Sequence, residues 1–322
     1  MFAKIISTGS YLPSKILTNN DLSKIVDTSD EWIYSRTGIK ERRIVENELT
    51  SDLAYLSALD ALKSCKLLSS DIDGIIVATS TPDLTFPSVA TIVQRKLGMK
   101  NGFAFDVQAV CSGFIYALSV AESMIASHKA KRLLVIGAET FSKIIDWKDR
   151  NTCVLFGDGA GAIILEATQS DPKINDNPGI LGVEIFSDGS YTDDLKTTGG
   201  VSSTQNVGCV MMNGTEVFKS AVNNLASVAD LILSKYNIDK SKIDWLIPHQ
   251  ANIRIIKAMG KKLNLDENKI ILTIDKHANT SAASIPLAFD YAFKNDKLKK
   301  GDLILSESMG AGFTWGATLI RL

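Results

Sequence analysis

A short pattern occurs twice in this chain of 322 residues, once in each half. The segment 71–77 reads DIDGIIV, and the segment 242–248, which starts 242 − 71 = 171 residues later, reads KIDWLIP. Each copy ends in a short apolar run that is typical of a buried strand. Each copy also follows a helix-like segment, at 51–66 and at 216–236. The chain is therefore expected to contain two structurally related halves.

The order of the elements that follow also recurs between the halves. Periodicity predicts strands at 104–110 and 270–275, helices at 112–127 and 280–293, strands at 132–137 and 302–306, and glycine-dense turns leading into strands at 157–165 and 310–319. Alternation of strands and helices predicts an α/β fold with crossover connections.

The recurrence favours one duplicated unit over the alternative, two unrelated α/β domains. We expect two stacked halves, at 1–170 and 211–322. The stretch 171–210 is rich in Gly, Asp, Ser and Thr and is expected to be a connecting loop region.

Composition narrows the classes of function. The chain has 35 basic and 36 acidic residues, which gives no signal for a nucleic-acid partner. Its four cysteines form no C-x-x-C pair and it has three histidines, so we expect no metal site. No segment has the roughly 20 apolar residues of a membrane span, and the N-terminus lacks the apolar core of a signal peptide. We therefore expect a cytoplasmic protein that does not bind membranes.

A glycine string, GDGAGA at 157–162, superficially resembles a dinucleotide-binding fingerprint. That fingerprint must follow a strand and open a helix. Here the apolar run AIILEA comes after the glycines instead. We therefore expect no dinucleotide and no other organic cofactor.

Cys111 is the candidate nucleophile. It lies between the strand-like AFDVQAV and the helix-like SGFIYALSVAESMIAS. Free N–H groups and a partial positive charge at a helix start favour the thiolate form. Ser112 and Gly113 are small and leave room for a substrate carbonyl. The alternative for any cysteine is a packed core position, to which we assign Cys65 and Cys153.

Two further segments strengthen the assignment of Cys111. In PHQANIRII, His249 follows a buried strand at its carboxyl end, where open α/β sheets bind ligands. In DKHANTSAASIP, Asn279 begins a helix-like run of tiny residues, although it could also merely cap that helix. Cys111 and Asn279 occupy nearly the same slot in the two halves, so a pseudo-twofold axis would bring them face to face.

The motifs AVCSGF, PHQANIRII, HANTSAAS and MGAGFTWGA occur in this order. Together they resemble the β-ketoacyl-acyl-carrier-protein synthase III family, the initiating condensing enzymes of type II fatty acid synthesis. The resemblance runs from TSDEWIYSRTGIKER to GFTWGATLIRL and implies a thiolase-like α/β fold, with stacked mixed sheets around buried helices. It also implies a catalytic triad of Cys111, His249 and Asn279. Asn279 distinguishes this pattern from thiolases, which use a second cysteine, and from elongating synthases, which use a second histidine.

The resemblance implies an acyltransferase that works by decarboxylative Claisen condensation. Cys111 takes the acyl group of an acyl-CoA, usually acetyl-CoA in this family, as a thioester. Malonyl-acyl-carrier protein then loses CO₂, and its enolate, held by His249 and Asn279, attacks that thioester. The backbone N–H groups of Cys111 and Ala311 are expected to form the oxyanion hole.

The family's binding residues carry over by position. The expected CoA contacts are Thr28, Trp32, Arg36, Arg150, Phe218 and Asn252, with Trp32 and Arg150 stacking on the adenine. The expected contacts with the acidic acyl carrier protein are Gln250, Ala251, Asn252, Ile253, Arg254, Lys219, Lys257 and Lys261. A solvated helix face is the alternative for each lysine.

The sequence departs from the family pattern at several places. Ala278 and Ala311 stand where some members have glycine, which is compatible with backbone N–H donation if φ is negative. Met309 stands where many members have phenylalanine, so acyl preference stays open. Phe86 matches a residue that reaches into the partner's acyl pocket, so we expect a homodimer with Phe86 and Met309 at the acyl pocket.

The sequence is also compatible with two other functions. A paralogous condensing or acyl-transferring enzyme of secondary metabolism would keep Cys111 but use another starter or acceptor. A non-catalytic acyl- or carrier-binding scaffold is a third reading, which an intact Cys–His–Asn set argues against.

Overall fold

The computed structural model describes residues 1–174 and 176–322 and contains two central sheets. The first sheet has the strand order β1-β7-β6-β4-β5, formed by β1 (Phe2–Tyr11), β4 (Gly74–Ala78), β5 (Phe103–Val107), β6 (Arg132–Thr140) and β7 (Asp158–Thr168). The second has the order β11-β12-β13-β8, formed by β8 (Gly179–Ser187), β11 (Trp245–Leu246), β12 (Leu303–Gly310) and β13 (Thr314–Arg321).

The two sheets have the same topology. In the first, β1 and β6 flank β7 antiparallel, and β4 joins β6 in parallel. In the second, β8 and β12 flank β13 antiparallel, and β11 joins β12 in parallel. A parallel bridge between Leu246 and Ile270 stands where β5 pairs with β4 in the first sheet. This correspondence confirms the predicted fold class of two related α/β halves.

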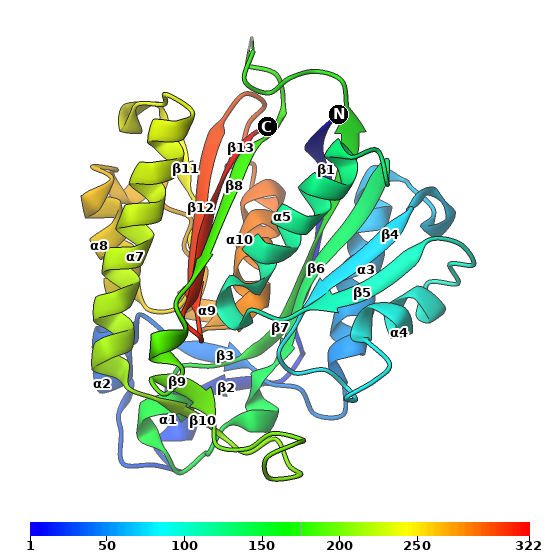
Figure 1. Ribbon diagram of the computed structural model, residues 1–322. Coiled ribbons are helices and arrows are strands. Elements are labelled where there is room, and N and C mark those ends of the chain that lie inside the picture. Colours follow the sequence, from blue (N-terminus) through cyan, green and yellow to red (C-terminus); the bar gives the residue numbers. More distant parts are fainter. Residues whose placement is uncertain (175) are drawn as a thin grey trace.

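Helices complete a five-layer arrangement (Figure 1). The outer layers are α3 with α4 on the first sheet and α7 with α8 on the second, while α5 and α10 lie between the sheets. Their bounds are α3 (Thr50–Cys65), α4 (Val89–Lys96), α5 (Gly113–Ala126), α7 (Gly214–Lys235), α8 (Ile253–Lys262) and α10 (Ser284–Lys294).

The strands of the first sheet are apolar on both faces because helices cover both of them. Along β4, Ile75 and Val77 face the outer core with α3, whereas Ile76 and Ala78 face the inner core with α5. The two-residue repeat of a strand produces this division. The continuous apolar runs that marked these segments in the sequence are therefore the signature of the buried layer.

Glycines in β6 and β7 allow the inner helix α10 and the turn before it, 281–283, to approach the sheet closely. A Cβ on Gly137 would lie 2.2 Å from the Ala282 carbonyl oxygen, and one on Gly161 would lie 2.5 Å from the Leu287 nitrogen. Part of the GDGAGA string is thus a packing surface inside a strand.

Two expectations about local structure are wrong. The stretch 171–210 is not all loop, because β8 at Gly179–Ser187 is the counterpart of β1 and the first strand of the second sheet. The last three of the nine residues of β8 are solvent-exposed, so the strand is only partly buried. The strand expected at 270–275 shrinks to the Ile270 bridge, because the Gln250 side-chain oxygen accepts the N–H groups of Thr273 and Ile274 instead.

Smaller elements cover the end of the sheets at which β12 finishes, the lower end in Figure 1. They are α1 (Asn19–Leu22), α2 (Asp30–Thr37), α6 (Arg150–Cys153), α9 (Ile274–His277), and the two-stranded ribbons β2 (Ile16–Thr18) with β3 (Glu41–Arg43) and β9 (Leu195–Thr197) with β10 (Val210–Met212). Over the described residues, the structure has no helix that is long and apolar enough to cross a membrane.

Candidate active site

Cys111 lies in a single 3₁₀ turn, η2 (Val110–Ser112), between β5 and the inner helix α5. Val110 has φ = +48°, a left-handed conformation that a β-branched residue adopts only under strain. Cys111 is 6% exposed. Its carbonyl oxygen accepts a 2.7 Å hydrogen bond from Ser308 Oγ on β12. Chain segments from both halves therefore hold the cysteine in place.

The end of β12 lies directly against the backbone of Cys111. A Cβ on Gly310 would lie 2.8 Å from the Cys111 nitrogen and 2.8 Å from the Ala109 carbonyl oxygen. Only glycine permits this approach. The next residue, Ala311, is the expected second oxyanion donor, and it is not among the residues with positive φ. Ala311 therefore has a negative φ, which is the condition under which alanine can donate its backbone N–H here.

Asn279 is tied to the first half of the chain. Its backbone N–H donates to the Leu155 carbonyl (3.0 Å), and its carbonyl accepts from the Gly157 N–H (3.0 Å). Its side-chain Oδ1 accepts the N–H of Ser281 (2.8 Å), at the start of η7 (Ser281–Ala283). Within the described part of the chain, Nδ2 of Asn279 has no hydrogen-bond partner, so its two protons remain available as donors.

His249 follows β11 and is attached to the same strand end as Cys111. Its backbone N–H donates to the Glu307 carbonyl (2.9 Å), and its Nδ1 lies 2.6 Å from Ser284 Oγ, at the start of α10. Glu307 adjoins Ser308, the residue bonded to Cys111. The turns η2 and η7 also pack on each other. The structure thus brings Cys111, His249 and Asn279 to one end of the second sheet.

The electrostatic environment of Cys111 differs from the sequence expectation. Burial raises the pKa of the Cys111 thiol to about 12, and the nearby Ser281 hydroxyl offsets this only in part. Burial of the sulfur thus opposes the thiolate form that the helix start was expected to favour. At neutral pH, Cys111 holds its proton.

Burial also shifts the pKa values of the other titratable groups near the site towards their uncharged forms. Desolvation lowers the pKa of His249 to about 3, so its imidazole is neutral at pH 7. It raises the pKa of Glu307 to about 8 and that of Glu139 to about 7. Glu139 accepts hydrogen bonds from Thr81 Oγ1 (2.6 Å) and Ser281 Oγ (3.1 Å). A neutral imidazole can donate a hydrogen bond without carrying charge.

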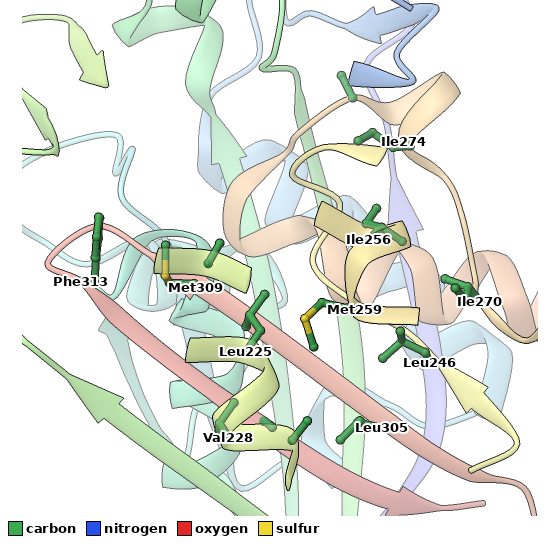
Figure 2. Packing of buried hydrophobic residues seen from close by; sticks show 14 of the residues in the cluster. Leu225, Val228, Leu246, Ile256, Met259, Ile270, Ile274, Leu305, Met309 and Phe313 are labelled. Carbon is green, nitrogen blue, oxygen red and sulfur yellow. The ribbon is translucent and has the colours of Figure 1, made fainter. Parts of the chain in front are cut away.

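An apolar cavity adjoins His249 between α7, α8 and β12. Its lining residues are Val217, Ala221, Leu225, Pro248, His249, Ala251, Ile255, Ile256, Met259, Glu307 and Met309. Figure 2 shows Met309 close to Leu225 of α7, with Met259 and Ile256 of α8 farther along the same layer. Asn224 Nδ2 also lies 3.8 Å from the Met309 sulfur. Met309 therefore shapes the space beside His249.

Three of the expected CoA contacts form a cluster of one aromatic ring and two guanidinium groups. The Cζ atoms of Arg36 and Arg150 lie 4.5 Å and 4.7 Å from the centroid of the Trp32 ring. Arg150 is also held by the Asp27 carbonyl (2.8 Å). A planar ring and planar cations at a half-exposed position suit an aromatic, phosphate-bearing ligand. Thr28, close by in sequence, has a buried hydroxyl without a partner among the described residues.

The remaining expected contacts divide into exposed and buried residues. Arg254, Lys257 and Lys261 of α8 are exposed, as is Lys219 of α7. Arg254 stacks on Phe218, with 5.3 Å from Cζ to the ring centroid. Arg254, Lys257 and Lys261 give α8 a basic surface, on which Lys257 also pairs with Glu267 (3.1 Å).

Gln250 is wrong as a contact for a carrier protein. It is 0% exposed, and its side chain bonds to the carbonyls of Pro248 and Ile271 and to two backbone N–H groups. Ile253 packs on Gly38, and the Asn252 side-chain oxygen caps α8 by accepting from Arg254 N–H (2.8 Å). The polar side chains of Gln250 and Asn252 thus form hydrogen bonds within the protein.

Phe86 lies outside the cluster formed by the triad. It is 81% exposed, in the loop before α4. In this single chain it does not reach the cavity beside His249, whose lining does not include it.

Sequence reasoning missed several residues of the site. Ser284 and Ser308 each bond to a triad residue, and Glu307 is buried beside His249. Ser284 is the last residue of the HANTSAAS motif, whereas Glu307 and Ser308 directly precede the MGAGFTWGA motif. A signal was present for Glu307, because a glutamate stands alone in the apolar strand LILSESMG.

Two models of a known protein family match this chain. The model for 3-oxoacyl-[acyl-carrier-protein] synthase III matches residues 105–189, and the model for its C-terminal part matches residues 233–322. The β-ketoacyl-[acyl-carrier-protein] synthase III of Wolbachia pipientis wMel is 57% identical over 319 residues and 98% of each chain. That of Paramagnetospirillum magneticum is 55% identical over 321 residues and 99% of each chain.

A solved structure shows the same fold. The 3-oxoacyl-[acyl-carrier-protein] synthase III of Aquifex aeolicus VF5 matches with a TM-score of 0.94 and 48% identity, over 99% of this chain and 100% of that one. The fold is thus that of the thiolase-like condensing enzymes, a class of acyltransferases. Within that class, the chain belongs to the β-ketoacyl-[acyl-carrier-protein] synthase III family.

Proposed function

We propose that this enzyme condenses an acyl-CoA, with acetyl-CoA as the expected starter, with malonyl-acyl-carrier protein and so initiates fatty acid synthesis. The observation that carries the proposal is the meeting of Cys111, His249 and Asn279 at the end of β12. A nucleophile and two uncharged hydrogen-bond donors are what a decarboxylative condensation needs.

In the first half-reaction, the Cys111 sulfur attacks the thioester carbonyl of the acyl-CoA. The bond from the acyl carbon to the CoA sulfur breaks, and the proton of the Cys111 thiol goes to the departing CoA sulfur. The high pKa of Cys111 supports this order, because the thiol holds its proton until attack. The backbone N–H groups of Cys111 and Ala311 would stabilise the oxyanion.

In the second half-reaction, the malonyl carboxylate leaves as CO₂. The electron pair of the broken bond forms an enolate whose oxygen accepts hydrogen bonds from His249 and Asn279. The enolate carbon then attacks the acyl carbonyl on Cys111, and the released thiolate takes a proton from solvent. The reaction balances without a metal or an organic cofactor.

The same proposal covers ligands, partner and compartment. Trp32, Arg36 and Arg150 would bind the nucleotide end of CoA, and the basic surface of α8 would bind the acidic carrier protein. The exposed Phe86 and the edge strand β5, on which Phe103 and Phe105 stack at 6.1 Å, favour a homodimer. The compartment we propose is the cytoplasm, as expected from the sequence.

A product assay tests the function. Purified enzyme with acetyl-CoA and malonyl-acyl-carrier protein should yield acetoacetyl-carrier protein, and Cys111→Ala and Asn279→Ala should abolish it. Acylation of wild-type Cys111 by a longer or branched acyl-CoA alone would move the enzyme to another starter. Stoichiometric acylation without turnover would favour the scaffold, and no acylation by any donor would exclude the catalytic proposal.

A further inference from the structure

The imidazole of His249 has one close side-chain partner, the hydroxyl of Ser284. The distance from Nδ1 to Ser284 Oγ is 2.6 Å, short for a hydrogen bond between neutral groups. Ser284 is 2% exposed and His249 is 6% exposed, so solvent offers neither group an easy substitute. The Gln250 N–H also points at Ser284 Oγ, at 3.4 Å.

These contacts determine which nitrogen of His249 carries the proton. The Ser284 hydroxyl has one proton to donate, and among the described residues its only acceptor is Nδ1 of His249. The Gln250 N–H is itself a donor and cannot accept that proton. If Nδ1 were protonated, the buried hydroxyl proton would have no acceptor, which is unfavourable. All three groups are satisfied only if Nδ1 is unprotonated and Nε2 carries the hydrogen.

We propose that Ser284 is a positioning residue that holds His249 in the Nε2–H tautomer, so that this nitrogen donates to the enolate oxygen. The inference rests on the proposed function and deepens it. In the opposite tautomer, Nε2 would present a lone pair to the enolate oxygen and repel it. Ser284 therefore acts through His249, and only the decarboxylation and condensation step should depend on it.

Nitrogen NMR of ¹⁵N-histidine-labelled protein reads the tautomer directly. The chain has only three histidines, so His249→Gln identifies the His249 signals. Wild type should show a protonated Nε2 and an unprotonated, hydrogen-bonded Nδ1. Ser284→Ala should yield a mixture of tautomers, whereas Ser284→Thr, which keeps the hydroxyl, should restore the wild-type signals.

The two half-reactions give the kinetic test. Ser284→Ala should slow malonyl-carrier-protein decarboxylation by about 10-fold to 100-fold, less than the ~10²–10³-fold expected for losing the donor itself. Acylation of Cys111 should stay within about twofold of wild type, because it does not use His249. The matched control is Ser306→Ala, which removes a buried hydroxyl bonded to the Ile247 carbonyl and should leave the tautomer unchanged.

The inference is overturned if Ser284→Ala leaves His249 wholly in the Nε2–H form, or if wild type holds the proton on Nδ1. Equal slowing of both half-reactions would also overturn it, because that pattern reports general damage to the fold. Should the wild-type enzyme not condense any substrate, the proposed function fails, but the NMR result still decides the tautomer.

Discussion

Ser308 Oγ donates a 2.7 Å hydrogen bond to the carbonyl oxygen of Cys111, across 197 residues of sequence. Ser308 lies on β12 of the second half, and Cys111 precedes α5 of the first half. The bond is buried and fixes the strained turn that carries the nucleophile. The position of Cys111 thus depends on contacts between the two halves.

Removing that bond should affect both stability and the first half-reaction. We expect Ser308→Ala to lower the free energy of unfolding by about 1–2 kcal/mol, because the Cys111 carbonyl would be left buried without this donor. Urea denaturation measures the loss, and burst acylation by ¹⁴C-acetyl-CoA measures the rate at Cys111. Ser190→Ala, in an exposed turn, is the control. Unchanged stability and acylation in Ser308→Ala would contradict the role of the bond.

Gly310→Ala should inactivate the enzyme. The new Cβ would lie 2.8 Å from both the Cys111 nitrogen and the Ala109 carbonyl, so the turn must shift. Displacing one oxyanion donor costs about 10²–10³-fold in kcat. The control is Gly189→Ala, where an added Cβ meets nothing within 4 Å. Steady-state kinetics on both variants checks this, and full activity in Gly310→Ala would show that the turn adapts freely.

Ala278→Gly should stabilise the protein. Ala278 has φ = +56° and ψ = −158°, a region populated almost only by glycine. Relief of this strain is worth about 1 kcal/mol. The matched control, Ala226→Gly inside α7, should instead destabilise by about 1 kcal/mol. Thermal unfolding of the two variants should therefore shift in opposite directions, and a lower melting temperature for Ala278→Gly would refute the strain argument.

Stability should fall with rising pH because of Glu307. Burial raises its pKa from 4.5 to about 8 in the folded protein. Between these values the folded state binds a proton that the unfolded state has released, so the free energy of unfolding decreases as pH rises. The full effect is at most a few kcal/mol, at about 1.4 kcal/mol per pKa unit.

Glu307→Gln removes this titration. Its stability relative to wild type should therefore improve between pH 5 and pH 8, as measured by urea denaturation at both values. The exposed Glu31→Gln should show no such change. Parallel pH dependence of wild type and Glu307→Gln would mean that Glu307 is ionised in the folded protein.

Trp32→Ala should raise the KM for acetyl-CoA by about tenfold, since stacking with a cation is worth roughly 1–2 kcal/mol. The KM for malonyl-acyl-carrier protein should change much less, because the carrier lacks a nucleotide. Trp32→Phe keeps an aromatic face between Arg36 and Arg150 and should retain most of the affinity. An equal rise of both KM values would place Trp32 outside the nucleotide site.

Much of the fold follows from local sequence. The buried strands were recognisable as apolar runs, because helices cover both faces of the sheet and no polar alternation interrupts them. β8 escaped notice because its last three residues are exposed and polar, turn-forming segments precede and follow it. Gln250 was mistaken for a surface contact, since a buried glutamine that replaces sheet hydrogen bonds looks the same in sequence as an exposed one.

The sequence by itself determined the repeated order of elements and the motifs around Cys111, His249 and Asn279, because these depend on residues close together in the chain. Only the tertiary structure decided their chemical state. The raised pKa of Cys111 and the lowered pKa of His249 arise from desolvation in the folded core, where Cys111 contacts Ser308, which lies 197 residues away in the sequence. Desolvation depends on the whole packed environment, and no local pattern of residues encodes it.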